Sequence, residues 1–145
     1  MKKIIISITL FLTIGVSIFA KNPIFSAKTI KCKWIEGEIY TYEKNLWGKE
    51  TDNKFNVEII LDSINLENNT ARIIANVGSG DLAVYPTSIG LMFIEQDVSA
   101  VHTLLIYYTT NKDNKNMFPA TYDRNIQILG VPMNSNYYGF CKIFG

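Results

Sequence analysis

The chain has 145 residues, of which 48% are hydrophobic and 19% charged, with 14 basic and 13 acidic side chains. This hydrophobic content is enough for one domain with its own core and is too high for a disordered chain. The near balance of charge leaves no basic excess to neutralise a phosphate backbone, so nucleic acid is not an expected partner.

The chain begins with the pattern of a secretory signal peptide. Lys2 and Lys3 give a positive start, residues 4–19 are almost wholly apolar, and the small residue Ala20 closes the run. We therefore predict that residues 1–20 are a cleaved signal peptide. Their removal takes away two positive charges and no negative one, so the formal charge falls from +1 to −1.

A membrane anchor is the alternative for the same segment. Residues 4–20 form a stretch of about 17 residues, the lower limit for a membrane-spanning helix, and its Ser, Thr and Gly residues make it less apolar. We favour the signal peptide, which leaves residues 21–145 as a single domain with no membrane span after cleavage. The compact Lys-Lys start is typical of a bacterial signal, so we expect a periplasmic or secreted protein.

Two cysteines, Cys32 and Cys141, lie near the two ends of the predicted domain. An exported chain meets an oxidising compartment, in which such a pair forms a disulfide. The bond would close a loop of roughly 110 residues, which the chain-entropy model values at about 4–5 kcal/mol. We predict that it joins the first strand to the last, and two buried free thiols are the alternative.

Beyond residue 27 the apolar residues recur with a period of two, which indicates half-buried strands. Residues 55–62 and 71–77 are the clearest examples, and the polar segment 63–69 between them suits a turn, so together they predict a β-hairpin. The same pattern and the strand propensity of aromatic and β-branched residues predict six further strands. These cover residues 29–35, 38–43, 88–96, 101–110, 122–129 and 137–144.

About eight short strands at spacings near ten residues predict an all-β fold, a single small antiparallel barrel or sandwich that is lipocalin-like in outline. Gly37 is expected to separate the first two strands, residues 111–116 are expected to form a loop, and a short helical turn is an alternative for residues 96–100. In size, compartment and strand count the chain resembles the small exported barrels that bacteria use as binding or inhibitor modules, including lysozyme inhibitors and lipocalin-like proteins.

The sequence contains no recognisable set of catalytic side chains. His102 is the only histidine and there is no G-x-S-x-G motif, so we interpret His102 as a strand residue that is partly buried or faces solvent. Neighbouring carboxylates occur at Glu36 and Glu38 and again at Glu95 and Asp97. Such pairs can cleave glycosidic bonds, although they are also common on solvated strands.

Metal and cofactor sites are not expected either. One histidine and two distant cysteines do not supply the four ligands of a zinc site, and the acidic loops lack the glycine spacing of a calcium loop. Residues 78–83 match G-x-G-x-x-A, but no helical pattern follows and Pro86 comes at once. We predict a flexible turn there and no bound cofactor.

Aromatic side chains are the remaining sign of a binding function, because exposed Tyr and Trp give a large contact area at little entropic cost. The alternative is a purely structural role, in which tyrosine is a good strand former and covers the rim of a barrel. Arg124 is one of only two arginines and is a candidate for a bidentate contact, with pairing to Asp123 as the alternative. The candidate binding residues are Trp47, Tyr107, Tyr108, Arg124, Tyr137 and Tyr138.

We therefore expect an exported, non-enzymatic binding or inhibitor module. Its partner would be a small apolar ligand inside the barrel, or a protein bound on an exposed face near Trp47 or residues 137–138. A surface-assembly subunit that joins its neighbours through an open sheet edge is one alternative. An exported hydrolase that uses the paired carboxylates is the other.

Overall fold

The computed structural model describes residues 22–76, 78–110, 114 and 116–145. The predicted signal peptide lies outside these residues, as does most of the predicted loop 111–116. A short 3-10 helix, η1 (Pro23–Ser26), comes before the sheet. The strands are β1 (Ile30–Glu43), β2 (Leu46–Thr51), β3 (Ile59–Asn65), β4 (Thr70–Ala75), β5 (Gly78–Pro86), β6 (Gly90–Gln96), β7 (Ala100–Tyr107), β8 (Met117–Ile128) and β9 (Val131–Ile143).

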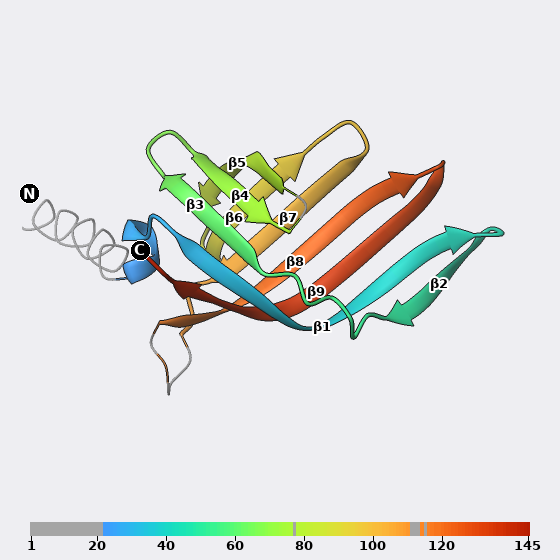
Figure 1. The fold of residues 1–145 in the computed structure, drawn as a ribbon, viewed down its shortest axis with the longest axis horizontal. Helices are drawn as coiled ribbons and strands as arrows, with labels where there is room; N and C mark the ends of the chain where they lie inside the picture. Colours follow the sequence, from blue (N-terminus) through green and yellow to red (C-terminus); the bar gives the residue numbers. More distant parts are fainter. Residues whose placement is uncertain (1–21, 77, 111–113, 115) are drawn as a thin grey trace, which may run out of the picture.

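The strands form one antiparallel sheet that closes into a barrel (Figure 1). Its order is β2-β1-β3-β4-β5-β6-β7-β8-β9, and a further pairing between β1 and β9 joins the two sides. The barrel itself has eight strands, because β2 pairs only with the far end of β1. The predicted small antiparallel barrel is therefore confirmed. No helix in the described part of the chain is long and apolar enough to cross a membrane.

Strand β1 is long enough to pair with two different strands along the same edge. Its first residues, Ile30–Cys32, pair with β3, and its last residues, Glu38–Glu43, pair with β2. The β1–β2 hairpin therefore extends away from the barrel as an arm (Figure 1). The predicted break at Gly37 is wrong, because β1 runs through it and the bulge lies between Trp34 and Glu36. A glycine is needed at position 37 because a Cβ there would collide with the ring of Tyr137.

The predicted flexible turn at residues 78–83 is also wrong. These residues form the first part of β5 and pair with β4, with Leu82 and Val84 facing the core. Their glycines obscured the alternation that marks a strand. Gly80 instead leaves room for a neighbouring side chain, since a Cβ there would lie 2.6 Å from Oε1 of Glu95.

Other strand boundaries differ by a few residues from those predicted. The strand predicted from Phe55 begins at Ile59, and residues 52–58 form a loop that packs Phe55 and Val57 against the core. The helical turn considered at residues 96–100 is not formed. A tight turn joins β6 to β7 there, and Oδ1 of Asp97 accepts hydrogen bonds from the backbone and the side chain of Ser99.

The core consists of the inward side chains of the eight barrel strands, closed at one end by η1. Ile24 of η1 is fully buried, and the amide of Asn22, the residue before η1, donates to the carbonyl oxygen of Tyr108 at the end of β7. The predicted disulfide between Cys32 and Cys141 is present and fully buried. This end of the barrel is therefore filled by side chains.

Candidate functional site

A pocket of about 350 Å³ opens inside the barrel. Going round the barrel, β3 and β4 lie four strands away from β7 and β8, so they form opposite walls. The wall on the side of β3 and β4, together with the loop before them, is apolar: Phe55, Val57, Ile59, Ile73 and Ala75. The opposite wall is polar: Glu95, His102, Tyr122 and Arg124. We call this space the mouth pocket.

The apolar wall is held in place by an aromatic stack. The ring of Phe55 lies on that of Tyr137, with 3.8 Å between centroids and an interplanar angle of 19°. The hydroxyl of Tyr137 donates to Oδ2 of Asp52 at 3.1 Å. These two contacts fasten both halves of the loop 52–58 to β9, and so they position Phe55 and Val57 at the pocket.

The polar wall comes from one row of residues across three neighbouring strands. Glu95 of β6 is the direct partner of His102 of β7, which is in turn the partner of Arg124 of β8. Each of them continues the inward phase of its strand beyond buried apolar residues such as Phe93 and Leu104. All three residues are half-buried, and charged side chains on the inner face of a barrel are unusual unless they are paired or functional. This row is therefore the strongest candidate for a functional site.

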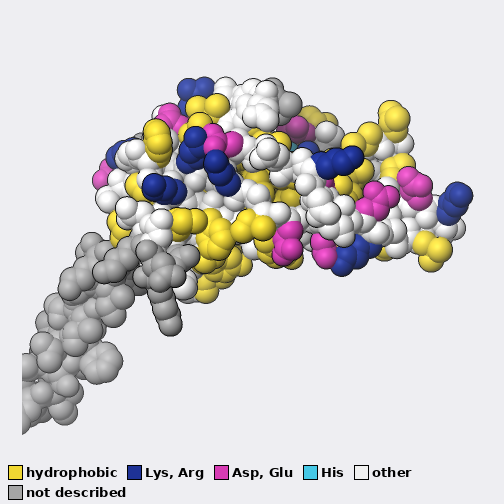
Figure 2. Space-filling model, turned by 60° about the horizontal axis from the view of Figure 1, so that its bottom comes forward, with side chains coloured by type: hydrophobic (Ala, Val, Ile, Leu, Met, Phe, Trp, Pro, Cys, Tyr) yellow, Lys and Arg dark blue, Asp and Glu magenta, His cyan; other side chains and the backbone are white. Residues whose placement is uncertain are grey.

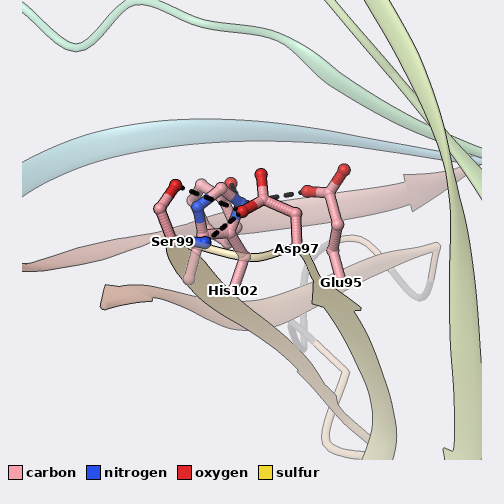
Figure 3. A network of polar contacts seen from close by, with 5 residues as sticks. Glu95, Asp97, Ser99 and His102 are labelled. Atoms are coloured by element: carbon pink, nitrogen blue, oxygen red, sulfur yellow. Dashed lines mark hydrogen bonds and ion pairs between the residues drawn. The ribbon is translucent and has the colours of Figure 1, made fainter. Parts of the chain in front are cut away.

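His102 and Glu95 form the central contact of the row (Figure 3). Nδ1 of His102 lies 2.9 Å from Oε2 of Glu95, and the carboxylate accepts, so Nδ1 carries the hydrogen in this contact. The hydroxyl of Tyr122 lies 3.3 Å from the same nitrogen. Nε2 of His102 is buried and has no hydrogen-bond partner among the described residues. The imidazole thus has one nitrogen that is hydrogen-bonded to Glu95 and one that no described residue engages.

Arg124 carries an unpaired positive charge at the pocket. Its guanidinium lies 5.9 Å from the ring centre of Phe55, a cation–π contact that spans the pocket. It makes no ion pair or hydrogen bond within the described part of the chain, so the alternative of pairing with Asp123 is not realised. Burial raises the pKa of the Asp123 carboxyl, as expected for an acid without a cation beside it.

Tyr122 forms the floor between the row and the core. Its ring stacks on Trp34 at 5.5 Å and meets the edge of His102 at 6.0 Å. Burial raises the pKa of its phenol to about 12. Nε1 of Trp34 is a second buried nitrogen without a partner in the described residues. Both unpartnered nitrogens therefore belong to rings that contact Tyr122.

The residues proposed from the sequence as binding residues do not gather at one place. Trp47 is 58% exposed on β2, far along the arm, and Tyr138 faces outward on β9. Tyr107 is the last residue of β7 and Tyr108 follows it beside η1, where the rings of Tyr108 and Phe25 are 5.0 Å apart. The inward ring of Tyr137 supports the pocket through Phe55. Only Arg124 lines the pocket directly.

The carboxylates proposed for a hydrolase are also dispersed. Glu38 pairs with Lys49 on the arm, and Asp97 accepts from Ser99 in the turn after β6, which leaves Glu95 as the one that lines the pocket. Ser99 is bonded to Asp97 in this turn (Figure 3), and no hydrogen bond joins it to His102 among the described residues. No group of three or more potential metal ligands is found in that part of the chain.

A second depression, of about 360 Å³, lies on the outer surface over β1 and β9. Figure 2 shows hydrophobic side chains gathered on the face that comes forward, with lysines and acids at its edges. Ile35 and Phe144 are 70% and 74% exposed here, and Lys31 and Lys33 both pair with Glu58. Two of the three lysines that line this depression are therefore paired with the same acid, and it lacks a row of inward polar side chains like that of the mouth pocket.

Comparisons with family models, with curated proteins and with solved structures find no match for this chain. The site therefore rests on its own geometry. Sequence analysis named Glu95 only as half of a carboxylate pair with Asp97, treated His102 as an ordinary strand residue and missed Tyr122. The signal that could have found them is the alternation of inward and outward side chains along a strand, because each of these residues occupies an inward position.

Proposed function

We propose that this protein is an exported, non-enzymatic binding module that holds a small organic ligand in the mouth pocket. The observation that carries the proposal is the combination of a filled core beside η1 and an open volume of about 350 Å³ between two unlike walls. Ligand pockets in proteins have volumes of roughly 300–1,000 Å³ and are mostly apolar with a few placed polar groups. The mouth pocket fits that description in volume and in lining.

Export belongs to the same proposal. The buried disulfide supports it, because cytosolic proteins keep their thiols reduced. A ligand met outside the cytosol has to be bound from dilute solution, and a rigid, pre-formed pocket lowers the entropic cost of doing so. The closed barrel supplies such a rigid frame.

The alternative of a hydrolase has less support. Of the four carboxylates considered, only Glu95 lines the pocket, and its Oε2 is engaged by His102. A glycosidase needs two carboxyl groups across one bond, at about 5 Å or roughly 6.5–9.5 Å. The geometry supports binding better than it supports this chemistry.

A surface-assembly subunit is a second candidate because of one observation. Strand β2 is the end of the sheet order and all six of its residues are exposed, so its outer edge is open to pair with another strand. Leu46 and Trp47 on this strand are 73% and 58% exposed. Light scattering of the purified chain tests this candidate. Polymers that disappear in a Leu46→Ser/Trp47→Ser double variant would favour assembly over ligand binding.

The fluorescence of a neutral, apolar dye tests the binding proposal. N-phenyl-1-naphthylamine brightens in apolar surroundings, and we expect the native chain to bind it. Ala75 lines the pocket, whereas its neighbour Ile74 faces outward and is 39% exposed. We expect Ala75→Trp to weaken binding at least about tenfold and Ile74→Trp to change it by less than about twofold. Equal binding by both variants would place the fluorophore outside the barrel and would contradict the proposal.

A further inference from the structure

We propose that the ligand of the mouth pocket is an organic monocarboxylate with a compact apolar body, and that Arg124 binds its carboxylate. This inference rests on the proposed binding function and specifies the chemical class of the ligand. It follows from three features of the pocket: an unpaired guanidinium, an acid already engaged by a histidine, and an apolar wall opposite.

The first feature is the availability of Arg124. Its side chain lines the pocket, and within the described residues no carboxylate or hydrogen-bond acceptor engages it. A guanidinium presents parallel N–H groups that match the two oxygens of a carboxylate. The other arginine, Arg72, has a different environment, since it lies on the outer face of β4 and donates to Oγ of Ser79 at 3.3 Å. Only one of the two arginines is therefore placed to bind an anion inside the barrel.

The second feature is that the acidic residue of the pocket, Glu95, already has a partner. Glu95 lies in the same row as Arg124, but its Oε2 contacts Nδ1 of His102 and its Oε1 points at Gly80. His102 lies between Glu95 and Arg124 in the row, so the carboxylate and the guanidinium do not form an ion pair with each other. The negative charge of Glu95 in this wall also disfavours a ligand with two negative charges, because like charges repel in a poorly solvated site. A monoanion suits the wall better than a phosphate monoester does.

The third feature is the shape and polarity of the remaining space. An apolar body would pack against Phe55, Val57 and Ile73 on the opposite wall. A pocket of about 350 Å³ has room for about a dozen water molecules at roughly 30 Å³ each. It therefore has room for a two-ring aromatic body such as a naphthyl group, and the remainder of a larger molecule would extend through the open mouth. A flat aromatic body also fits the edge of the Phe55–Tyr137 stack.

Three probes that share one apolar body test the inference. They are 2-naphthoate, 2-naphthalenemethanol and 2-naphthylmethylamine, which carry a negative, a neutral and a positive group. Their affinities are measured on the full mature chain by calorimetry, with displacement of N-phenyl-1-naphthylamine as a second readout. We expect the carboxylate to bind about 10- to 100-fold more tightly than the alcohol, as for a hydrogen-bonded charge pair.

Variants then assign that preference to one side chain. Arg124→Met keeps an unbranched apolar stem and removes the guanidinium, so we expect the ratio of carboxylate to alcohol affinity to fall to within about threefold of unity. Arg124→Lys keeps the charge without the two-pronged geometry and should give an intermediate ratio. Arg72→Met is the matched control and should leave the ratio unchanged. Melting curves of all three variants establish that the barrel is folded.

The outcomes separate this inference from the proposed function. If none of the three probes binds and the fluorophore does not bind either, the pocket is not a binding site and both fail. If the alcohol binds as tightly as the carboxylate, or if Arg124→Met keeps the preference, the binding function stands and the carboxylate assignment is overturned. A preference for the amine would assign recognition to Glu95 and would also overturn it.

Discussion

Cys32 and Cys141 are direct partners in the ladder between β1 and β9, so the disulfide crosses the junction at which the barrel closes. The two residues are 109 positions apart in the chain. Eleven residue pairs, from Ile30↔Ile143 to Thr41↔Met133, form this ladder, and the bond lies near the end that η1 covers. The covalent link therefore reinforces a contact between the two ends of the domain that chain entropy opposes most strongly.

Removal of the disulfide should lower stability without changing the fold. In the chain-entropy model a closed loop of this length contributes about 4–5 kcal/mol. We expect the Cys32→Ala/Cys141→Ala variant to lose about this amount in urea denaturation, while its far-UV circular dichroism remains that of a β protein. Cys32→Ala alone should lose nearly as much, because the bond and not the side chain is responsible. A denaturation midpoint equal to that of the oxidised native chain would contradict this prediction.

Gly139 should tolerate no side chain. It lies on β9 between β1 and β8, and a Cβ there would collide with the backbone carbonyl of Lys33. Because backbone cannot move aside as a flexible side chain does, we expect Gly139→Ala to cost about 2 kcal/mol or more in the free energy of unfolding. Gly48→Ala on β2 is the control, since its Cβ would lie 3.8 Å from the nearest atom, and it should change stability by less than about 0.5 kcal/mol. Similar losses in both variants would show that the cost arises from strand propensity rather than from the collision.

The barrel could be predicted from the sequence wherever burial alternates along a strand. Residues 59–61 and 91–93 show that alternation, and in both the predicted inward side chains are buried. Strand β2 was missed because all six of its residues are exposed, so it carries no hydrophobic pattern at all. Strand β5 was missed because Gly78 and Gly80 occupy positions where an apolar residue would have marked the phase.

The site was predictable only in part, because its geometry depends on register between strands. The inward phase of Glu95, His102 and Arg124 is present in the sequence. What the sequence does not contain is the pairing of β6 with β7 and of β7 with β8 that brings the three into one row. Tyrosine content pointed instead to Tyr107 and Tyr138, whose positions follow from strand propensity as well as from binding.

Tyr122 should be detectable as a phenol that ionises late. Burial raises its pKa to about 12, whereas a tyrosine in an unfolded chain has a pKa near 10. Between about pH 10 and pH 12 the unfolded state loses this proton and the folded state keeps it, so the free energy of unfolding falls as pH rises. We expect Tyr122→Phe to show a shallower decline in that window, although part remains because burial also raises the pKa of Tyr137.

The measurement combines absorbance at alkaline pH with denaturation at fixed pH values. Tyr85→Phe removes one exposed phenol from β5 and is the matched control, so its decline should equal that of the native chain. If Tyr122→Phe and Tyr85→Phe decline alike, the phenol of Tyr122 is not the late-ionising group.

Phe55 should contribute both to stability and to binding, because it is shared by the core and the pocket. Its ring stacks on Tyr137 at 3.8 Å and faces the guanidinium of Arg124 across the pocket. An aromatic pair contributes about 0.5–1.5 kcal/mol beyond the area it buries, so Phe55→Ala should lower the free energy of unfolding by about 2 kcal/mol. It should also weaken N-phenyl-1-naphthylamine binding more than about fivefold, since one wall of the pocket is lost. Phe144→Ala, at a ring that is 74% exposed on the outer face, should change both quantities little. Equal effects of the two substitutions would mean that the loop 52–58 does not form a wall of the binding site.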